Sequence, residues 1–144
     1  MMEETAAEDV VKVELSEGSE HIVKMLNSGE GGQMIFEPAV IKVSVGDTIH
    51  FKATDAAHNS VSVDGMVPAG AASWASQLSQ DISVTLDKEG VYVYQCDPHL
   101  IMAMVGVIQV GEAVNMDEIR SAASSYSANF LMNNDRLQGY LNQL

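Results

Sequence analysis

The sequence predicts a mainly β fold, a β-sandwich followed by two C-terminal helices. Between residues 21 and 111, seven or eight short apolar or alternating runs are separated by Gly, Pro, Asn and Asp turn signals. After Gly111 the spacing of apolar residues changes from a period of two to that of a helix. We therefore divide the chain into a weakly ordered acidic extension at residues 1–20, the sandwich at 21–111 and a helical appendage at 112–144 that packs on it.

Composition limits the class of partner. The chain carries a formal net charge of −13 at pH 7. We expect no nucleic-acid binding, because contacts to phosphates need a basic face. The excess of acid favours a partner with a basic docking face, through electrostatic steering. Solubility or a salty habitat is an equally good interpretation of the same charge.

The chain has neither a transmembrane pattern nor a secretory signal. No apolar run reaches the roughly 18 residues that span a bilayer, so we expect no membrane insertion. The start, M-M-E-E-T-A-A-E-D, is acidic where a signal would be basic and then apolar. The protein is therefore either cytoplasmic or a form whose signal was removed or replaced by an expression start. The single cysteine excludes an internal disulfide.

The first half of the sandwich contains four predicted strands. The run I-V-K-M-L-N at residues 22–27 ends in a glycine-rich turn, and residues 34–36 form a short apolar strand. Residues 40–45 and 48–53 alternate between apolar and polar side chains on either side of a Gly-Asp turn. This pattern predicts that the latter two strands form a β-hairpin.

The second half contains the remaining strands. Residues 60–63 form a short strand, and a long connection over residues 64–77 follows it. Residues 82–86 alternate again. Residues 91–94 and 105–110 are rich in valine and tyrosine, and we expect them to enter and leave one loop as a strand pair.

Two helices are predicted after the sandwich. Asn115 is placed to cap the first one, with Glu118 three residues later as in a capping box. Asn and Asp residues near position 134 separate it from the second helix. The apolar faces consist of Met116, Ile119 and Ala123 in the first helix, and of Leu137, Tyr140, Leu141 and Leu144 in the second.

The loop between the last two strands carries three metal-binding side chains. The segment Y-Q-C-D-P-H-L-I-M-A-M contains Cys96, His99 and Met104. Thiolate, imidazole and thioether are donors that copper prefers. A lone cysteine at a strand end is usually a small buried hydrophobe, but here the two other donors follow it on the same loop. Met102 competes with Met104 for the thioether position, and the spacing favours Met104.

A fourth donor must come from elsewhere in the chain. His21 lies at the border of the acidic extension and His50 in mid-strand, and we interpret both as ordinary surface groups. His58 lies in a loop between two strands and is the best candidate for the fourth donor. The adjacent Asn59 is placed to tie the two ligand loops together through hydrogen bonds.

Two imidazoles, a thiolate and a weak thioether form the donor set of blue-copper electron-transfer sites. The weak thioether lets the site avoid a square plane, so little rearrangement accompanies the gain or loss of an electron. No coordination position is left for a substrate and no acid–base pair is visible, so we do not expect an enzyme. Pro98 has no N–H and cannot donate to the cysteine sulfur, and such donors help to set the potential.

Several segments resemble the pseudoazurins, small bacterial type 1 copper proteins of the cupredoxin fold. They are F-E-P-A-V-I-K-V-S-V-G-D-T-I-H-F, A-H-N, M-V-P-A-G-A and Y-Q-C-D-P-H-L-I-M-A-M-V-G-V-I-Q-V-G. The spacing Cys-x2-His-x4-Met is shared with plastocyanins, whereas M-L-N-S-G, G-x-M-I-F-E-P and the helical tail are narrower features. The resemblance implies a cupredoxin-type Greek-key sandwich that binds one copper ion.

The resemblance also implies roles for single residues. The copper ligands would be His58, Cys96, His99 and Met104, with Met34 near the ring of His99. His99 would be the ligand at the surface through which electrons pass. The apolar docking patch around it would consist of Pro68, Leu100, Ile101 and Met102.

The partners implied by the resemblance are redox proteins. A soluble, monomeric, periplasmic carrier would take electrons from an unidentified donor and deliver them to a reductase such as copper nitrite reductase. Pseudoazurins ring the docking patch with lysines, whereas acids far outnumber lysines in this chain. We therefore expect a partner that is basic or apolar where it docks.

Two other functions compete with electron transfer. One is a copper-binding or delivery protein that holds the metal without redox cycling. The other is a non-redox interaction domain whose site has lost its metal or takes zinc, because thiolate and imidazole bind zinc as well. A blue or green Cu(II) complex that ascorbate bleaches reversibly would favour the electron carrier.

Overall fold

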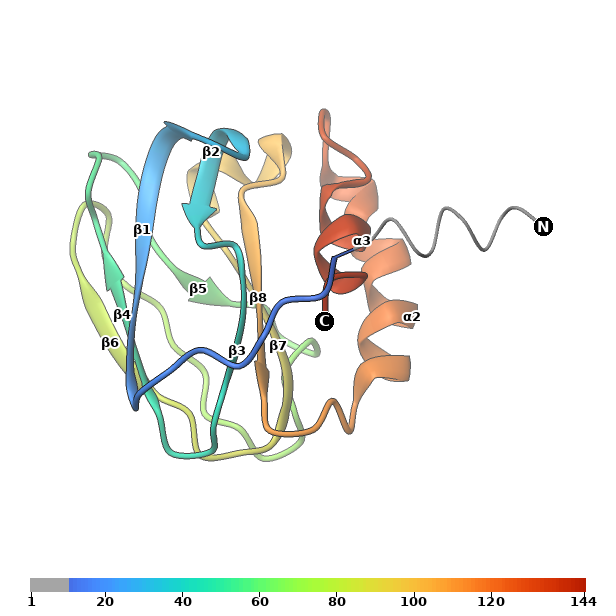
Figure 1. Ribbon diagram of the computed structural model, residues 1–144. Helices are drawn as coiled ribbons and strands as arrows, with labels where there is room; N and C mark the ends of the chain where they lie inside the picture. The colour runs from blue at the N-terminus through green and yellow to red at the C-terminus, as the bar shows by residue number, and fades with distance from the viewer. Residues whose placement is uncertain (1–10) are drawn as a thin grey trace.

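Eight strands form two facing sheets in the computed structural model, which describes residues 11–144 (Figure 1). The predicted Greek-key β-sandwich is therefore confirmed. The first sheet has the strand order β2 (Gly32–Glu37), β1 (Glu20–Gly29), β4 (Thr48–Lys52) and β6 (Ile82–Thr85). The second sheet has the order β3 (Val40–Val43), β8 (Val105–Val110), β7 (Gly90–Gln95) and β5 (Val61–Ser62).

The predicted hairpin between residues 40–45 and 48–53 is wrong. β3 pairs in parallel with β8, whereas β4 lies in the other sheet between β1 and β6. The Gly-Asp turn therefore carries the chain from one sheet to the other. Alternation along the sequence fixes which side chains face the core, but it does not fix which strand supplies the hydrogen bonds. The last strand pair is as predicted, because β7 and β8 are antiparallel neighbours.

The main core lies between the two sheets. Along β1 the buried Val23 and Met25 alternate with the exposed Ile22 and Lys24, as the strand period requires. Aromatic rings fill the centre of this core, and the rings of Phe36 and Tyr94 meet edge to face with centroids 4.7 Å apart. The other buried aromatic side chains of this cluster are Phe51, Trp74 and Tyr92.

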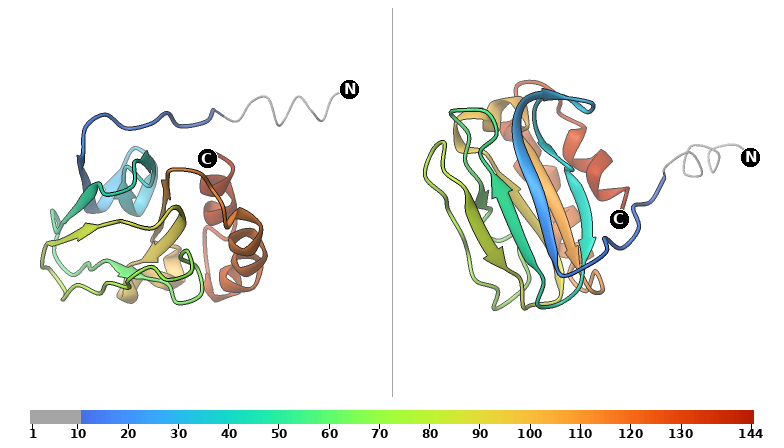
Figure 2. Two further views of the ribbon diagram at one scale, coloured as in Figure 1. Left: turned by 90° about the horizontal axis from the view of Figure 1, so that it is seen from below. Right: turned by 60° about the vertical axis from the view of Figure 1, so that its left-hand side comes forward.

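The helices form a third layer on the outer face of the second sheet (Figures 1 and 2). They are α2 (Met116–Tyr126), the short η2 (Ser127–Asn129) and α3 (Arg136–Leu141). Their buried side chains pack with valines of β7 and β8 in a second core, as the helical period predicted. These side chains are Ile119 and Ala123 of α2, and Leu137 and Leu141 of α3.

The predicted side-chain cap of α2 is not formed. Asn115 occupies the N-cap position but makes no capping hydrogen bond. Its amide instead pairs with the backbone of Val91 in β7, where Oδ1 accepts from the N–H at 2.7 Å and Nδ2 donates to the carbonyl at 3.0 Å. Asn115 therefore anchors the start of α2 to the second sheet.

The described part of the N-terminal extension runs across the sandwich to the C-terminus. Ser16 donates its N–H to the carbonyl of Lys42 in β3, and Val13 donates to Gln143 beyond α3. The Lys12 ammonium donates to the carbonyls of Asn142 and Leu144. Residues 1–10 lie outside the described residues, and the weak order expected of residues 1–20 stays a prediction. None of the helices between residues 11 and 144 has the length and apolar character to cross a membrane.

Candidate metal centre

Cys96 and His99 lie where β7 ends and a short 3-10 helix, η1 (Asp97–Met102), begins. Pro98 occupies the first turn of η1, where a backbone N–H is not required. The N–H of Cys96 donates to the carbonyl of Met104 at 2.9 Å, and the N–H of Met104 donates to that of His99 at 3.2 Å. Residues 96–104 therefore form a hydrogen-bonded loop that connects β7 to β8 at one end of the sandwich (Figure 1). We call this segment the metal loop.

His58 reaches the same place from the connection between β4 and β5. Its Nε2 lies 2.8 Å from the Oδ1 of Asn27 in β1, so Nε2 carries the proton and donates it to the amide oxygen. The lone pair is then on Nδ1, which lies 3.7 Å from the sulfur of Cys96. A hydrogen bond on the far ring nitrogen is the usual way in which proteins orient a metal-binding histidine.

The three donor atoms of His58, Cys96 and His99 converge on one point. The Nδ1 of His99 lies 3.3 Å from the cysteine sulfur, and the donor atoms of all three residues lie within 4.8 Å of one another. For metal bonds of roughly 2.0–2.3 Å at angles of about 100–120°, a sulfur and a nitrogen bound to one ion stand roughly 3.3–3.8 Å apart. The observed separations fit a single ion between the three side chains.

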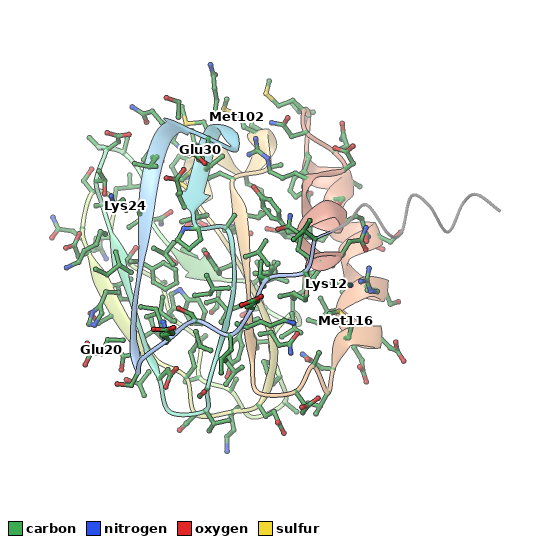
Figure 3. All side chains as sticks on the ribbon, in the orientation of Figure 1. Lys12, Glu20, Lys24, Glu30, Met102 and Met116 are labelled. Carbon is green, nitrogen blue, oxygen red and sulfur yellow. The ribbon has the colours of Figure 1, made fainter. Side chains whose placement is uncertain are left out.

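Met104 lies in the core beside this cluster. Its side chain is fully buried and belongs to the same core as Cys96. Met102 is half-buried, carries its side chain at the outer end of η1 and does not belong to that core (Figure 3). The burial of Met104 beside Cys96 therefore supports the sequence-based expectation that Met104, and not Met102, is the thioether donor.

Asn59 ties the loop of His58 to the metal loop. Its Oδ1 accepts the N–H of Asp97 at 2.8 Å, and its Nδ2 donates to the carboxylate of Asp97 and to the carbonyl of Ser76, each at 3.3 Å. The sequence predicted such a tie but not that Asp97 is its partner. These bonds leave little freedom for the two loops to separate.

Burial shifts the pKa values of two of the donor side chains, Cys96 and His58, in the metal-free protein. Burial raises the pKa of the Cys96 thiol, and hydrogen bonds to the backbone of Asn59 and His99 only partly oppose it. Burial also lowers the pKa of His58, and the nearby His99 lowers it further. A neutral His58 keeps the Nδ1 lone pair that a metal needs, whereas the thiol loses its proton when a cation binds.

Among the residues that the structure describes, the site comes nearest to solvent along η1. His99 is half-buried, so its ring is the part of the donor set nearest to solvent, whereas His58, Cys96 and Met104 are fully buried. Leu100 is half-buried and Ile101 is 51% exposed. Met34 in β2 packs against the core that contains Cys96 and Met104; its predicted position beside the ring of His99 stays a prediction.

Pro68 does not belong to this surface, which corrects the predicted docking patch. Pro68 is buried, and its Cγ would stand only 2.7 Å from a Cβ on Gly90. Gly90 begins β7, whereas Cys96 and η1 follow the other end of that strand. The connection over residues 64–77 carries Pro68 to the end of the sandwich opposite the metal loop. The local sequence around Pro68 does not predict this path.

Three residues contact His58 or the metal loop without any local sequence signal. Asn27 stands 31 positions before His58, at what reads as an ordinary strand end. Arg136 begins α3, yet it donates hydrogen bonds to carbonyls of Met34 and Ala103. The exposed Leu131 is also joined to η1, because its N–H donates to the carbonyl of Ile101 at 2.7 Å. Only the tertiary fold brings these residues to the metal loop.

The comparisons with known proteins agree with this geometry. Residues 23–111 match the family model described as copper binding proteins of the plastocyanin/azurin family. The chain is 44% identical to a pseudoazurin of Methylorubrum extorquens over 102 residues, covering 71% of this chain and 68% of the relative. It is 41% identical to a pseudoazurin of Paracoccus pantotrophus, covering 71% of each. The crystal structure of native pseudoazurin from Hyphomicrobium denitrificans superimposes with a TM-score of 0.78 at 40% identity, covering 87% of this chain and 98% of that structure.

Proposed function

This chain belongs to the pseudoazurins, within the plastocyanin/azurin family of copper-binding proteins, and we propose that it transfers single electrons between partner proteins. One copper ion serves as its cofactor, bound by His58, Cys96, His99 and Met104. The observation that carries this proposal is the placement of the Cys96 sulfur 3.7 Å and 3.3 Å from the Nδ1 atoms of the two histidines. When bound there, copper supplies a one-electron couple, and the thiolate gives strong covalent overlap with Cu(II).

The surroundings of the donors favour electron transfer over catalysis. His58, Cys96 and Met104 are fully buried, and the same holds for much of the core around them. The hydrogen bonds of Asn27 and Asn59 hold both histidine-bearing loops in place. A fixed donor set keeps the rearrangement between Cu(II) and Cu(I) small, which suits a carrier. It opposes the ligand exchange that a copper-delivery protein would need.

Electrons would pass at the exposed edge of His99. The surface around it is apolar, with Leu100, Ile101 and Met102 on η1. The connection between η2 and α3 extends it, because Leu131 is 76% exposed and Met132 is 48% exposed. Both of these residues donate backbone hydrogen bonds to the carbonyl of Ile101, so they lie beside η1. We call Leu100, Ile101, Met102, Leu131 and Met132 the apolar edge.

Charge supports a basic partner. Asp97 on η1 and Asp135 before α3 are exposed acids on the segments that form the apolar edge. Glu30, in the turn between β1 and β2, lies toward the same end of the molecule as Met102 (Figure 3). We infer a redox acceptor of the nitrite reductase kind with a basic or apolar docking face, and a periplasmic, monomeric carrier.

Copper binding by the purified protein tests the electron-carrier proposal. Addition of Cu(II) to the metal-free protein should give one equivalent of an intensely blue or green complex that ascorbate bleaches and an oxidant restores over repeated cycles. Cys96→Ser should remove the visible band and keep the far-ultraviolet circular dichroism of the sandwich. Met104→Leu should shift the band and the reduction potential, whereas the matched control Met102→Leu should change neither.

Each failure would point to a different error. A colourless complex, or loss of the metal on reduction, would contradict the electron-carrier proposal. A visible band that survives in Cys96→Ser would remove Cys96 from the ligand set. A shift in Met102→Leu but not in Met104→Leu would exchange the roles of the two methionines.

A further inference from the structure

The last three residues before Met104 present their carbonyl groups to the C-terminal appendage. The carbonyl of Ile101 accepts from the N–H groups of Leu131 at 2.7 Å and Met132 at 3.3 Å. The carbonyl of Met102 accepts from Nδ2 of Asn133 at 3.2 Å. The end of the metal loop is therefore bonded to the segment that connects the two helices, and not only to its own strand pair.

Arg136 makes the largest share of these contacts. Its Nη1 lies 3.5 Å from the carbonyl oxygen of Met102 and 3.2 Å from that of Ala103. The same Nη1 lies 3.0 Å from the carbonyl oxygen of Met34 in β2, and Nη2 lies 3.3 Å from that of Gln33. A guanidinium carries several donors in a fixed fork, so one side chain can bond to two segments at once.

Two of these carbonyls belong to residues in an unusual backbone conformation. Met34 has φ 52° and Ala103 has φ 60°, in the left-handed region that side chains other than glycine rarely adopt. Such a conformation persists when surrounding contacts hold it. Ala103 immediately precedes Met104, so the direction in which Met104 leaves the loop depends on the conformation of Ala103.

We propose that Arg136 is a positioning residue for the metal loop, because it fixes Ala103 and Met34 against each other from the start of α3. Through this contact the helical appendage holds the end of the metal loop, and with it Met104, at a set distance from Cys96 and His99. This inference rests on the proposed function for its effect on copper. Its effect on the loop itself does not depend on a bound metal.

Arg120 provides a matched control. It is the second arginine of the appendage, and its Nη1 and Nη2 donate to Oδ1 of Asn142 at 3.0 Å and to the carbonyl of Leu141 at 3.3 Å. It therefore holds the C-terminus to α2 and does not touch the metal loop. Arg136→Met and Arg120→Met remove the same group and the same charge.

The first measurement is amide hydrogen exchange in the metal-free protein. The N–H of Ala103 donates to the carbonyl of Leu100, and the N–H of Met104 donates to the carbonyl of His99. Both amides exchange faster when the metal loop opens, because opening breaks these hydrogen bonds. Arg136→Met should speed exchange at these two amides by about tenfold or more, the effect of losing one charge-assisted hydrogen bond from the closed state. Arg120→Met should leave them unchanged. Arg136→Lys retains the charge but carries its donors on one nitrogen, so its exchange rates should fall between those of wild type and Arg136→Met. It serves as the test if Arg136→Met does not fold.

The second measurement uses the copper-loaded protein. Arg136→Met should change the visible spectrum and the reduction potential, and Arg136→Lys should restore both in part, whereas Arg120→Met should change neither. The inference is overturned if the exchange rates of Ala103 and Met104 match in the Arg136 and Arg120 variants. It is also overturned if loop exchange rises while the spectrum and potential of a coloured protein stay fixed. A wild-type protein that forms no coloured complex contradicts the proposed function instead, and the exchange result then still decides whether Arg136 holds the loop.

Discussion

At the scale of the residue, His58 shows how a side chain is prepared for a metal. The Oδ1 of Asn27 accepts a hydrogen bond from the N–H at Nε2, and burial keeps the ring neutral, so Nδ1 presents a lone pair toward Cys96. Neither effect requires the metal, because both come from the folded protein. The site is therefore set before an ion arrives, which limits the rearrangement on binding.

His21 is a second histidine with a defined role, and its interpretation as a surface group is wrong. It is 6% exposed, and its Nε2 lies 2.8 Å from the carboxylate of Asp47, which is also buried. Its Nδ1 lies 2.9 Å from the hydroxyl of Ser16. Asp47 also accepts the N–H of Ser44 at 3.0 Å. This network fastens the turn between β3 and β4 to the start of β1.

The pKa of Asp47 makes this network sensitive to acid. Burial raises the pKa, but the hydrogen bonds of His21 and Ser44 and the charge of His21 together bring it below the ordinary value. Between the native pKa and the ordinary value of about 3.9, the unfolded chain binds a proton that the native protein does not. The stabilisation is therefore complete above about pH 3.9 and is lost as the pH falls through the native pKa of Asp47.

Replacement of Asp47 tests this pH dependence. In the metal-free protein, Asp47→Asn should lower the free energy of unfolding at pH 7 by about 1–3 kcal/mol and make it fall less steeply as the pH drops below about 4. Urea unfolding at a series of pH values measures both quantities. Asp64→Asn, at an exposed acid, is the control and should leave the profile unchanged. An Asp47→Asn profile parallel to wild type would show that another group sets the acid sensitivity.

At the scale of the element, α2 is held by an anchor where the sequence predicted a cap. Asn115 satisfies the N–H and the carbonyl of Val91, at the start of β7. At this end of β7 only β8 is a paired neighbour, because β5 pairs only with Tyr94 and Gln95. Backbone groups on the other side of the strand need a different partner, and burial makes an unpaired group costly. The amide of Asn115 matches both groups, since it carries one acceptor and one donor.

Variants of Asn115 distinguish an anchor from a cap. Asn115→Ala should lower the free energy of unfolding by about 1–3 kcal/mol, because two backbone groups lose their partners. Asn115→Ser would restore stability if capping mattered, since serine is a good cap. We expect no such rescue, because its side chain is too short to bond both groups of Val91. Asn129→Ala, which removes one exposed hydrogen bond, should cost less than about 0.5 kcal/mol. Urea unfolding is the measurement, and full rescue by serine would contradict the anchor.

At the scale of the whole molecule, we expect the distribution of charge to govern association with a redox partner. The net charge of −13 gives the molecule a negative field, and the apolar edge lies within it. Fields of this kind raise the rate of encounter with an opposite charge and weaken as salt screens them. Under the proposed function, we expect apolar contact at η1 to determine how the bound partners sit. Varying the ionic strength therefore separates the contribution of electrostatic steering to the association rate from that of apolar contact.

Electron-transfer kinetics test this separation. The second-order rate with a basic cytochrome as partner should fall by about tenfold or more as salt rises from about 10 mM to about 0.5 M. With an acidic redox protein as the control, the rate should rise over the same range, because salt then screens a repulsion. Stopped-flow absorbance of the copper band measures both. A rate with the basic partner that does not respond to salt would leave apolar contact as the sole basis of docking.

The sequence by itself determined what lies within one strand, one helix or one loop. The positions of the strands along the chain, the two helical faces and the candidate donors Cys96, His99 and Met104 follow from spacing over a few residues. The candidate donor His58 follows from the chemistry of the missing donor. The tertiary structure decided which segments meet. It separated β3 from β4, placed Pro68 away from η1 and brought Asn27 and Arg136 to the metal loop. The physical reason is that periodicity and turn chemistry act along the chain, whereas a hydrogen bond between residues 31 or 33 positions apart exists only after the sheets and helices have packed.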